Sequence, residues 1–155
     1  MTIVFFSCNY NADYKTINHE NKIQLSIPGW VSKEKLADDA MLSFANRYRN
    51  FYAIVIEGEK TISLDSAGNK AFHRIYPSLD SAKFSTDKKE VNGMSAVQYE
   101  LEGKMGTEKE KIYYSLCILE GKKKYYQICL WTRGAERRKK YSDDFYKIIH
   151  SFKEI

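Results

Sequence analysis

Six segments of this chain predict β-strands, because their residues either alternate between apolar and polar or are apolar throughout. In the segment KIQLSI, for example, Ile23, Leu25 and Ile27 share one face. The six predicted strands cover residues 22–27, 40–46, 51–57, 95–104, 111–120 and 124–132. The short connections RYR and GKK favour antiparallel neighbours. The last two strands are apolar on both faces, which predicts central positions in the sheet.

The C-terminal segment changes to a helical period. Tyr141, Phe145, Ile148, Ile149 and Phe152 recur at spacings that form one stripe of an amphipathic helix. This long helix follows the last strand and is expected to pack on the sheet. Residues 58–90 have no firm period, and they predict only a helix around 69–76 and a further turn near 78–83. The order of elements predicts an α+β fold built on an antiparallel sheet.

The first residues, MTIVFFSCN, fit the end of a lipoprotein signal in which Cys8 would carry the lipid. The polar residues that follow, up to Asn21, fit a flexible tether. Only seven residues precede Cys8 and none is Lys or Arg, so this interpretation requires a start upstream of Met1. The alternative is a short apolar first strand. The predicted organisation is therefore a signal remnant and tether over 1–21 and a single domain over 22–155.

Charge does not indicate a nucleic-acid partner. The net charge is +5 and the pI is near 9.0. The predicted strand between the basic cluster at 122–124 and the next one separates them by roughly 26 Å, at ~3.3 Å per residue, so they form no continuous stripe. That second cluster consists of Arg133 and, at the start of the predicted helix, Arg137, Arg138, Lys139 and Lys140. It is either a solvated surface or a docking point for phosphate or an acidic partner.

No catalytic, metal or cofactor motif stands out among the chemically active residues. The chain has three Cys and three His, and they lack the spacing of a zinc or iron-sulfur site. Cys117 and Cys129 lie in apolar strands, which predicts inert core thiols and no enzyme. If the connecting turn centres on Lys122, these two cysteines are diagonal neighbours on one face. A one-residue change of turn length would bring them opposite each other as a disulfide.

Three aromatic residues are a candidate groove. Tyr113, Tyr125 and Trp131 are predicted to share one sheet face with both cysteines. They are either core beneath a helix or the wall of a groove for a ligand or peptide.

Several stretches resemble the PsbP-like proteins of the Mog/PsbP fold family, over about residues 22–155. They are DDAMLSFANRYRNFYAIVIEGEK, VNGMSAVQYELEG, YYSLCILEGKKKYYQICLWT and FYKIIHSFKEI. The resemblance implies an α/β/α sandwich with a central antiparallel sheet and a non-enzymatic binding role. The chain departs from the family at 58–90, where Gly68 and Pro77 are expected to interrupt a long helix that is usual there.

These observations lead to a hypothesis of a cell-envelope lipoprotein. Its domain would bind an unidentified protein partner as a monomer, without cofactor or nucleic acid, and Cys8 would anchor it to the membrane. One alternative is a cytosolic adaptor of the same fold. Another is a small-ligand-binding or enzymatic domain, which requires a polar cleft with converging titratable groups.

Overall fold

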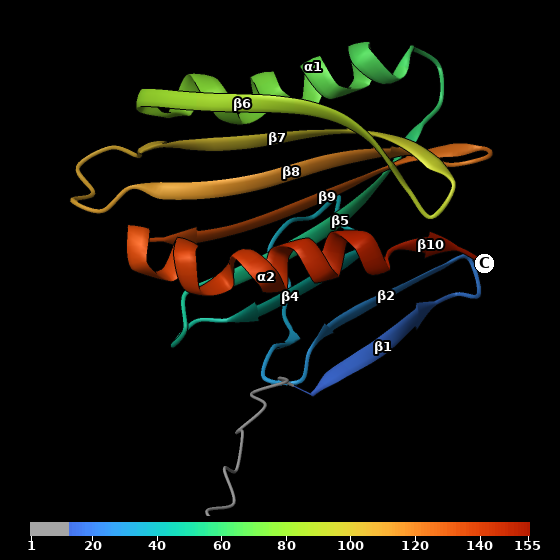
Figure 1. Cartoon of the computed structure of the whole chain (residues 1–155), viewed down its shortest axis with the longest axis horizontal. Helices are drawn as coiled ribbons and strands as arrows, with labels where there is room; N and C mark the ends of the chain where they lie inside the picture. The colour runs from blue at the N-terminus through green and yellow to red at the C-terminus, as the bar shows by residue number, and fades with distance from the viewer. Residues whose placement is uncertain (1–12) are drawn as a thin grey trace, which may run out of the picture.

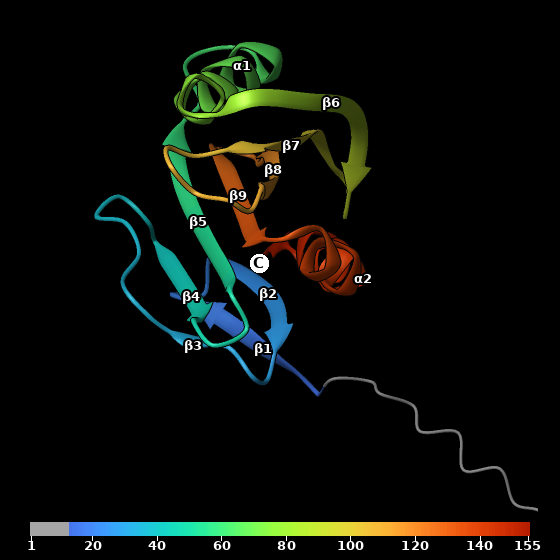
Figure 2. The same cartoon turned by 90° about the vertical axis from the view of Figure 1, so that its left-hand side faces the viewer.

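The computed structural model, which describes residues 13–155, contains a seven-stranded antiparallel sheet with a helix on each face (Figure 1). The strands follow the order β3 (Ser32–Lys33), β4 (Leu42–Asn46), β5 (Phe51–Glu59), β9 (Lys124–Arg133), β8 (Ile112–Glu120), β7 (Met94–Lys104) and β6 (Asp80–Val91). Helix α1 (Leu64–Ile75) packs on β7, β8 and β9 from one side, and α2 (Ala135–Ser151) packs on β8 and β9 from the other (Figure 2). The predicted α+β sandwich is confirmed, with seven strands in place of about six.

A second sheet packs beside α2 and completes the core on that side. It consists of β1 (Tyr14–His19), β2 (Ile23–Pro28) and β10 (Lys153–Glu154), with β2 in the middle. Ile23, Leu25 and Ile27 of β2 are almost fully buried in one core with the apolar stripe of α2.

The predicted flexible tether is wrong for the part of it that the structure describes. Tyr14–His19 pairs antiparallel with β2 along its whole length, with Ile17 opposite Leu25. The strand lies at an edge and its side chains are half-buried or exposed, so it lacks the apolar alternation that marks a core strand. Cys8 lies outside the described residues.

The β8–β9 hairpin differs by one residue from the expected register. Cys117 is paired with Ile128 in place of Gln127, and Cys129 is paired with Leu116. The loop closes with Glu120 opposite Tyr125, so the turn centre lies between Lys122 and Lys123. Side chains alternate between faces, so this shift puts the two cysteines on opposite sides of the sheet. Both are free thiols.

Gly68 does not interrupt a helix, contrary to the expectation from the sequence. Helix α1 runs through it from Ser63, whose side chain accepts a hydrogen bond from the Ser66 N–H. A Cβ on Gly68 would lie 2.8 Å from both Tyr99 Oη and Val97 Cγ1. Glycine therefore allows α1 to approach β7 closely. Pro77 lies beyond the end of α1, in the short 3₁₀ helix η1 (Tyr76–Ser78).

The turn expected near 78–83 is wrong, because a long strand, β6, begins at Asp80. Most of its side chains are exposed, so the residues show no buried alternation that would predict a strand. A two-residue turn with positive φ at Asn92 (49°) and Gly93 (82°) connects it to β7. These left-handed values are typical of an Asn-Gly hairpin.

Candidate binding pocket beneath helix α1

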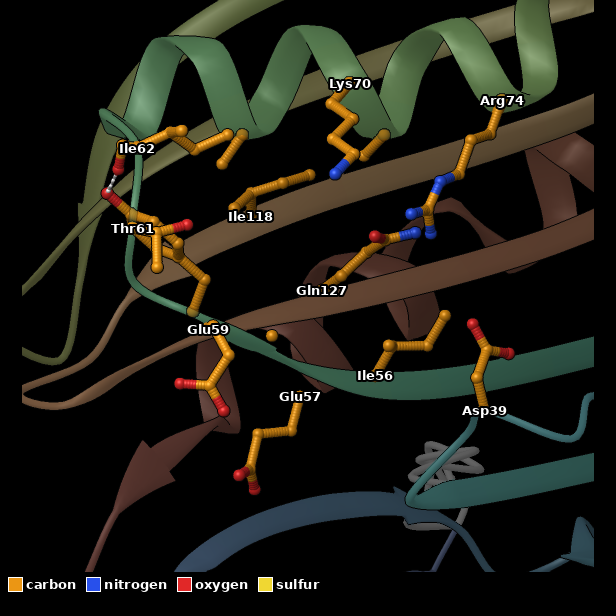
Figure 3. A pocket seen from close by; sticks show the side chains of 14 residues that line it. Asp39, Ile56, Glu57, Glu59, Thr61, Ile62, Lys70, Arg74, Ile118 and Gln127 are labelled. Carbon is orange, nitrogen blue, oxygen red and sulfur yellow. Dashed lines mark hydrogen bonds between the residues drawn. The ribbon is translucent and has the colours of Figure 1, made fainter.

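A pocket of about 350 Å³ lies between α1 and the strands β5 and β9 (Figure 3). It lies where α1 packs more closely on β7, β8 and β9 than on β5. Ile56 of β5 and Gln127 of β9 are paired across the two strands and lie on the floor. The segment between β5 and α1 closes one end.

Two cations form the wall that α1 contributes, and in residues 13–155 neither makes an ion pair. Lys70 and Arg74 are four residues apart, so both lie on the same side of the helix. Their side chains extend toward Gln127 (Figure 3). The ion pairs of the described chain use other lysines and arginines. These two charges are therefore available to a ligand.

Apart from Gln127, the floor of the pocket is apolar, and a hydrogen bond holds one end of it in place. Ile118 is 2% exposed and Tyr125 is 6% exposed, while Ile56 is half-buried. The Tyr125 hydroxyl donates a hydrogen bond of 2.6 Å to the Ile62 carbonyl. This bond ties the β5–α1 connection to the floor and fixes the closed end of the pocket.

The acidic residues around the pocket fall into two groups. Glu57 and Glu59 both pair with Lys124, with 3.8 Å between Glu57 Oε1 and Lys124 Nζ. Asp39 comes from the segment before β4 and faces the Arg74 end (Figure 3). It forms no ion pair within residues 13–155. At that end, the two helix cations outnumber the one carboxylate that could neutralise them.

The two thiols of the described chain are unsuited to nucleophilic chemistry. Burial raises the pKa of Cys117 and of Cys129 to about 12, so neither forms a thiolate near neutral pH. Residues 13–155 also contain no group of three or more His, Cys, Asp or Glu side chains that could hold a metal ion. The pocket contains charged side chains, an amide and an apolar surface. These groups can bind a ligand, but they do not form a nucleophilic or metal site.

The prediction that Tyr113, Tyr125 and Trp131 share one sheet face is wrong, so the three residues do not form the candidate groove. Tyr113 lies on the α2 face, because it is paired with Thr132, whereas Tyr125 and Trp131 lie on the α1 face. The one-residue register shift separates them. Of the three, Tyr125 lines the α1 pocket, and Trp131 stacks on Tyr52 with ring centroids 5.4 Å apart.

The four basic side chains at the start of α2 contact different partners and do not converge on one point. Arg138 Nη2 lies 2.7 Å from Glu100 Oε2 on the sheet, while Arg137 Nη1 lies 3.4 Å from Glu110 Oε2. The Lys140 ammonium lies 5.8 Å from the centroid of the Tyr141 ring, and Lys139 is exposed. Two of the four charges thus already have acidic partners. Docking of a partner on this cluster stays a prediction.

Lys70 and Arg74 were missed as site residues because residues 58–90 lack a clear period. The only signal was their spacing of four, which brings two cations together once a helix is assigned. No helix of residues 13–155 is both long and apolar enough to span a membrane.

Comparison with solved structures identifies the fold. The cyanobacterial PsbP protein CyanoP of Synechocystis is similar over 97% of this chain and 99% of its own, with a TM-score of 0.69 and 13% identity. The Ran-binding protein Mog1p of Saccharomyces cerevisiae covers 92% of this chain and 95% of its own, with a TM-score of 0.64 and 9% identity.

A third similar structure is LpqN of Mycobacterium tuberculosis, described as involved in cell envelope biogenesis. It covers 92% of this chain and 90% of its own, with a TM-score of 0.61 and 11% identity. By sequence, the chain matches no protein-family profile and no curated protein. At such low identity the likeness concerns the fold, and the chain has the Mog1/PsbP-like fold.

Proposed function

We propose that this chain is a non-catalytic binding domain of a cell-envelope lipoprotein, with the α1 pocket as its binding site. The observation that carries the proposal is the pair of cations, Lys70 and Arg74, beside an apolar floor. Ligand sites commonly combine apolar walls with a few polar groups that fix orientation. The volume of about 350 Å³ admits a small molecule or one group of a larger partner.

The fold neighbours support both halves of the proposal. Mog1p is a Ran-binding protein, and LpqN is described as acting in cell envelope biogenesis. Neither role transfers to this chain by itself. A lipid on Cys8 would place the domain at a membrane, as the sequence MTIVFFSCN suggests. A single acyl chain anchors only weakly, so the modification would carry more than one.

Cell fractionation tests the location. The gene is expressed from its own locus, with whatever sequence lies upstream, as wild type and as Cys8→Ser. The wild-type protein is expected in the membrane fraction and Cys8→Ser in the soluble fraction. Wild-type protein that is soluble would favour a cytosolic adaptor and would reject the lipid anchor.

Photo-crosslinking in the same cells tests the site. A photoreactive amino acid replaces Ile62, which lines the pocket and is 43% exposed. The control position is Tyr48, which is 95% exposed and does not line the pocket. A discrete adduct, identified by mass spectrometry, is expected at position 62 and not at position 48. No adduct at 62, or the same adduct at both positions, contradicts the proposed site.

A further inference from the structure

We infer that the α1 pocket takes a small organic oxyanion, with its carboxylate or phosphate group between Lys70 and Arg74. The apolar part of the ligand would lie on Ile56, Ile118 and Tyr125. The inference rests on the proposed function, because it names the ligand class of the same site.

The geometry of the two cations suits an oxyanion. Residues four apart on a helix have Cβ atoms roughly 5–6 Å apart, so one carboxylate or phosphate can reach both side chains. Arg74 offers a planar fork of N–H donors, and Lys70 offers an ammonium with three donors. The Gln127 amide lies below them and adds a neutral hydrogen-bonding group (Figure 3).

The charges differ between the two ends of the pocket, and the end at the helix cations favours an anion. Glu57 and Glu59 lie away from Arg74 and share Lys124 as their ionic partner (Figure 3). Lys70 and Arg74, by contrast, have no ionic partner in residues 13–155. Two like charges at this spacing repel each other on a helix, and a bound anion relieves that repulsion.

Asp39 provides a way to distinguish an anionic from a cationic ligand. It faces the same end of the pocket as Arg74, from the opposite side (Figure 3). Its carboxylate repels an incoming oxyanion and competes for Arg74. Replacing it with a neutral amide should therefore strengthen oxyanion binding and weaken the binding of any cation. The sign of this change separates the two ligand classes.

The floor and the volume of the pocket limit the size and polarity of the rest of the ligand. Ile56 is half-buried and offers apolar surface on which a ring or short chain would be removed from water, while Ile118 and Tyr125 are buried and add little exposed area. A volume of about 350 Å³ is at the lower end of ligand pockets, which run roughly from 300 to 1,000 Å³. A small ring-bearing acid therefore fits better than a long chain.

Titration calorimetry of the full-length chain tests the inference with two matched pairs of probes. Phenyl phosphate is compared with phenol, and 3-phenylpropionate is compared with 3-phenylpropanol. At least one acid is expected to bind ~10-fold or more tightly than its neutral analogue, and to weaken as salt is added. Comparison of the two acids tells a phosphate site from a carboxylate site.

Variants place the binding in the pocket. Lys70→Ala and Arg74→Ala are each expected to weaken the acid by ~10-fold or more, and Asp39→Asn to strengthen it by about 2-fold or more. The matched controls are Lys104→Ala and Lys109→Ala, each of which removes one positive charge at an exposed residue outside the pocket. Both should leave affinity unchanged, and circular dichroism verifies that each variant is folded.

Four results would overturn the inference. They are failure of both acids to bind, equal binding of the neutral analogues, affinity unchanged by both cation variants, and weaker binding by Asp39→Asn. If the crosslink at position 62 nevertheless forms in cells, the proposed function survives with a different ligand; if it does not form, both fail.

Discussion

Cys117 and Cys129 lie on adjacent strands but face opposite sides of the sheet, because Cys117 is paired with Ile128 and Cys129 with Leu116. One sulfur is in the core under α2 and the other in the core under α1. A disulfide between them would require one strand to turn over, which the packing on both faces opposes. The fold therefore keeps two separate, protected thiols.

Both thiols should resist modification in the native protein. In the Cys8→Ser variant, a thiol-specific reagent near neutral pH is expected to label neither Cys117 nor Cys129 before the protein unfolds. Burial and a pKa raised to about 12 are the reasons. Both should react at once in denaturant. Native labelling of either one at the rate seen in denaturant would show that its strand face is open.

The apolar stripe of α2 should supply most of what this helix contributes to the stability of the protein. Phe145 is 1% exposed and packs on Phe51, and Ile149 is fully buried. Phe145→Ala is expected to cost ~3–5 kcal/mol and Ile149→Ala ~2–5 kcal/mol in chemical denaturation. Tyr146 is 61% exposed on the same helix, so Tyr146→Ala is the control and should cost less than ~0.5 kcal/mol. Losses below ~1 kcal/mol for both core variants would mean that the stripe is not buried.

The strand β1 should contribute to stability, which reverses the expectation from the sequence. Comparing Δ1–21 with Δ1–12 isolates it, because the two deletions differ by residues 13–21, which contain β1. Deletion of β1 removes its pairing with β2 and the 2.9 Å hydrogen bond from Lys15 Nζ to the Val31 carbonyl. The thermal midpoint of Δ1–21 should be lower by more than ~5 °C. Equal midpoints would mean that β1 is not held in solution.

His150 should make the protein less stable in mild acid. Burial, with a smaller effect from Lys89, lowers its pKa in the folded state. Lys89 Nζ lies 3.3 Å from His150 Nε2. The unfolded chain therefore binds the proton more readily, so this stability is complete above the ordinary His pKa of ~6.5 and falls as the pH decreases below it.

Urea denaturation at pH 8 and pH 5 measures this effect in wild type and His150→Gln. The wild type should lose more stability between the two pH values than the variant does. His19 and His73 are present in both proteins, so their contributions cancel. An identical loss in both would contradict the assignment to His150.

Gly68→Ala should destabilise the protein, although alanine favours helices by ~1 kcal/mol over glycine. The new Cβ would lie 2.8 Å from Tyr99 Oη and Val97 Cγ1, so α1 would have to move away from β7. A net loss of ~1–3 kcal/mol is expected. Asn69→Ala, at an exposed position of the same helix, is the control and should be neutral or slightly stabilising. A stability gain from Gly68→Ala would show that there is space for a methyl group between α1 and β7.

The elements that could be predicted from the sequence are those with a clear pattern of buried apolar side chains. Strands β2, β5, β7, β8 and β9 alternate or are apolar on both faces, and α2 has a single apolar stripe, so these elements could be assigned. The edge strands β1 and β6 are held by backbone hydrogen bonds, and their side chains are mostly exposed or half-buried. Side-chain pattern carries little information about such strands.

The candidate site needed the structure for two reasons. Whether Tyr113 and Tyr125 share a face depends on the loop at 121–123, where a change of one residue in the register reverses the answer. Lys70 and Arg74 form a site because α1 packs over β9 beside β5, and this packing is a tertiary feature. Neither the register nor the placement of a helix can be read from local periodicity.

The two edges of the large sheet have a consequence for behaviour at high protein concentration. On one side, β3 is only two residues long, so it offers little backbone for another chain to join. On the other, β6 is 12 residues long and irregular in its pairing only between Asp80 and Lys83, and it exposes both Phe84 and Lys88. Short, charged and irregular edges oppose strand addition, whereas long edges with exposed apolar residues permit it. We expect edge-to-edge association at high protein concentration to use β6 and not β3.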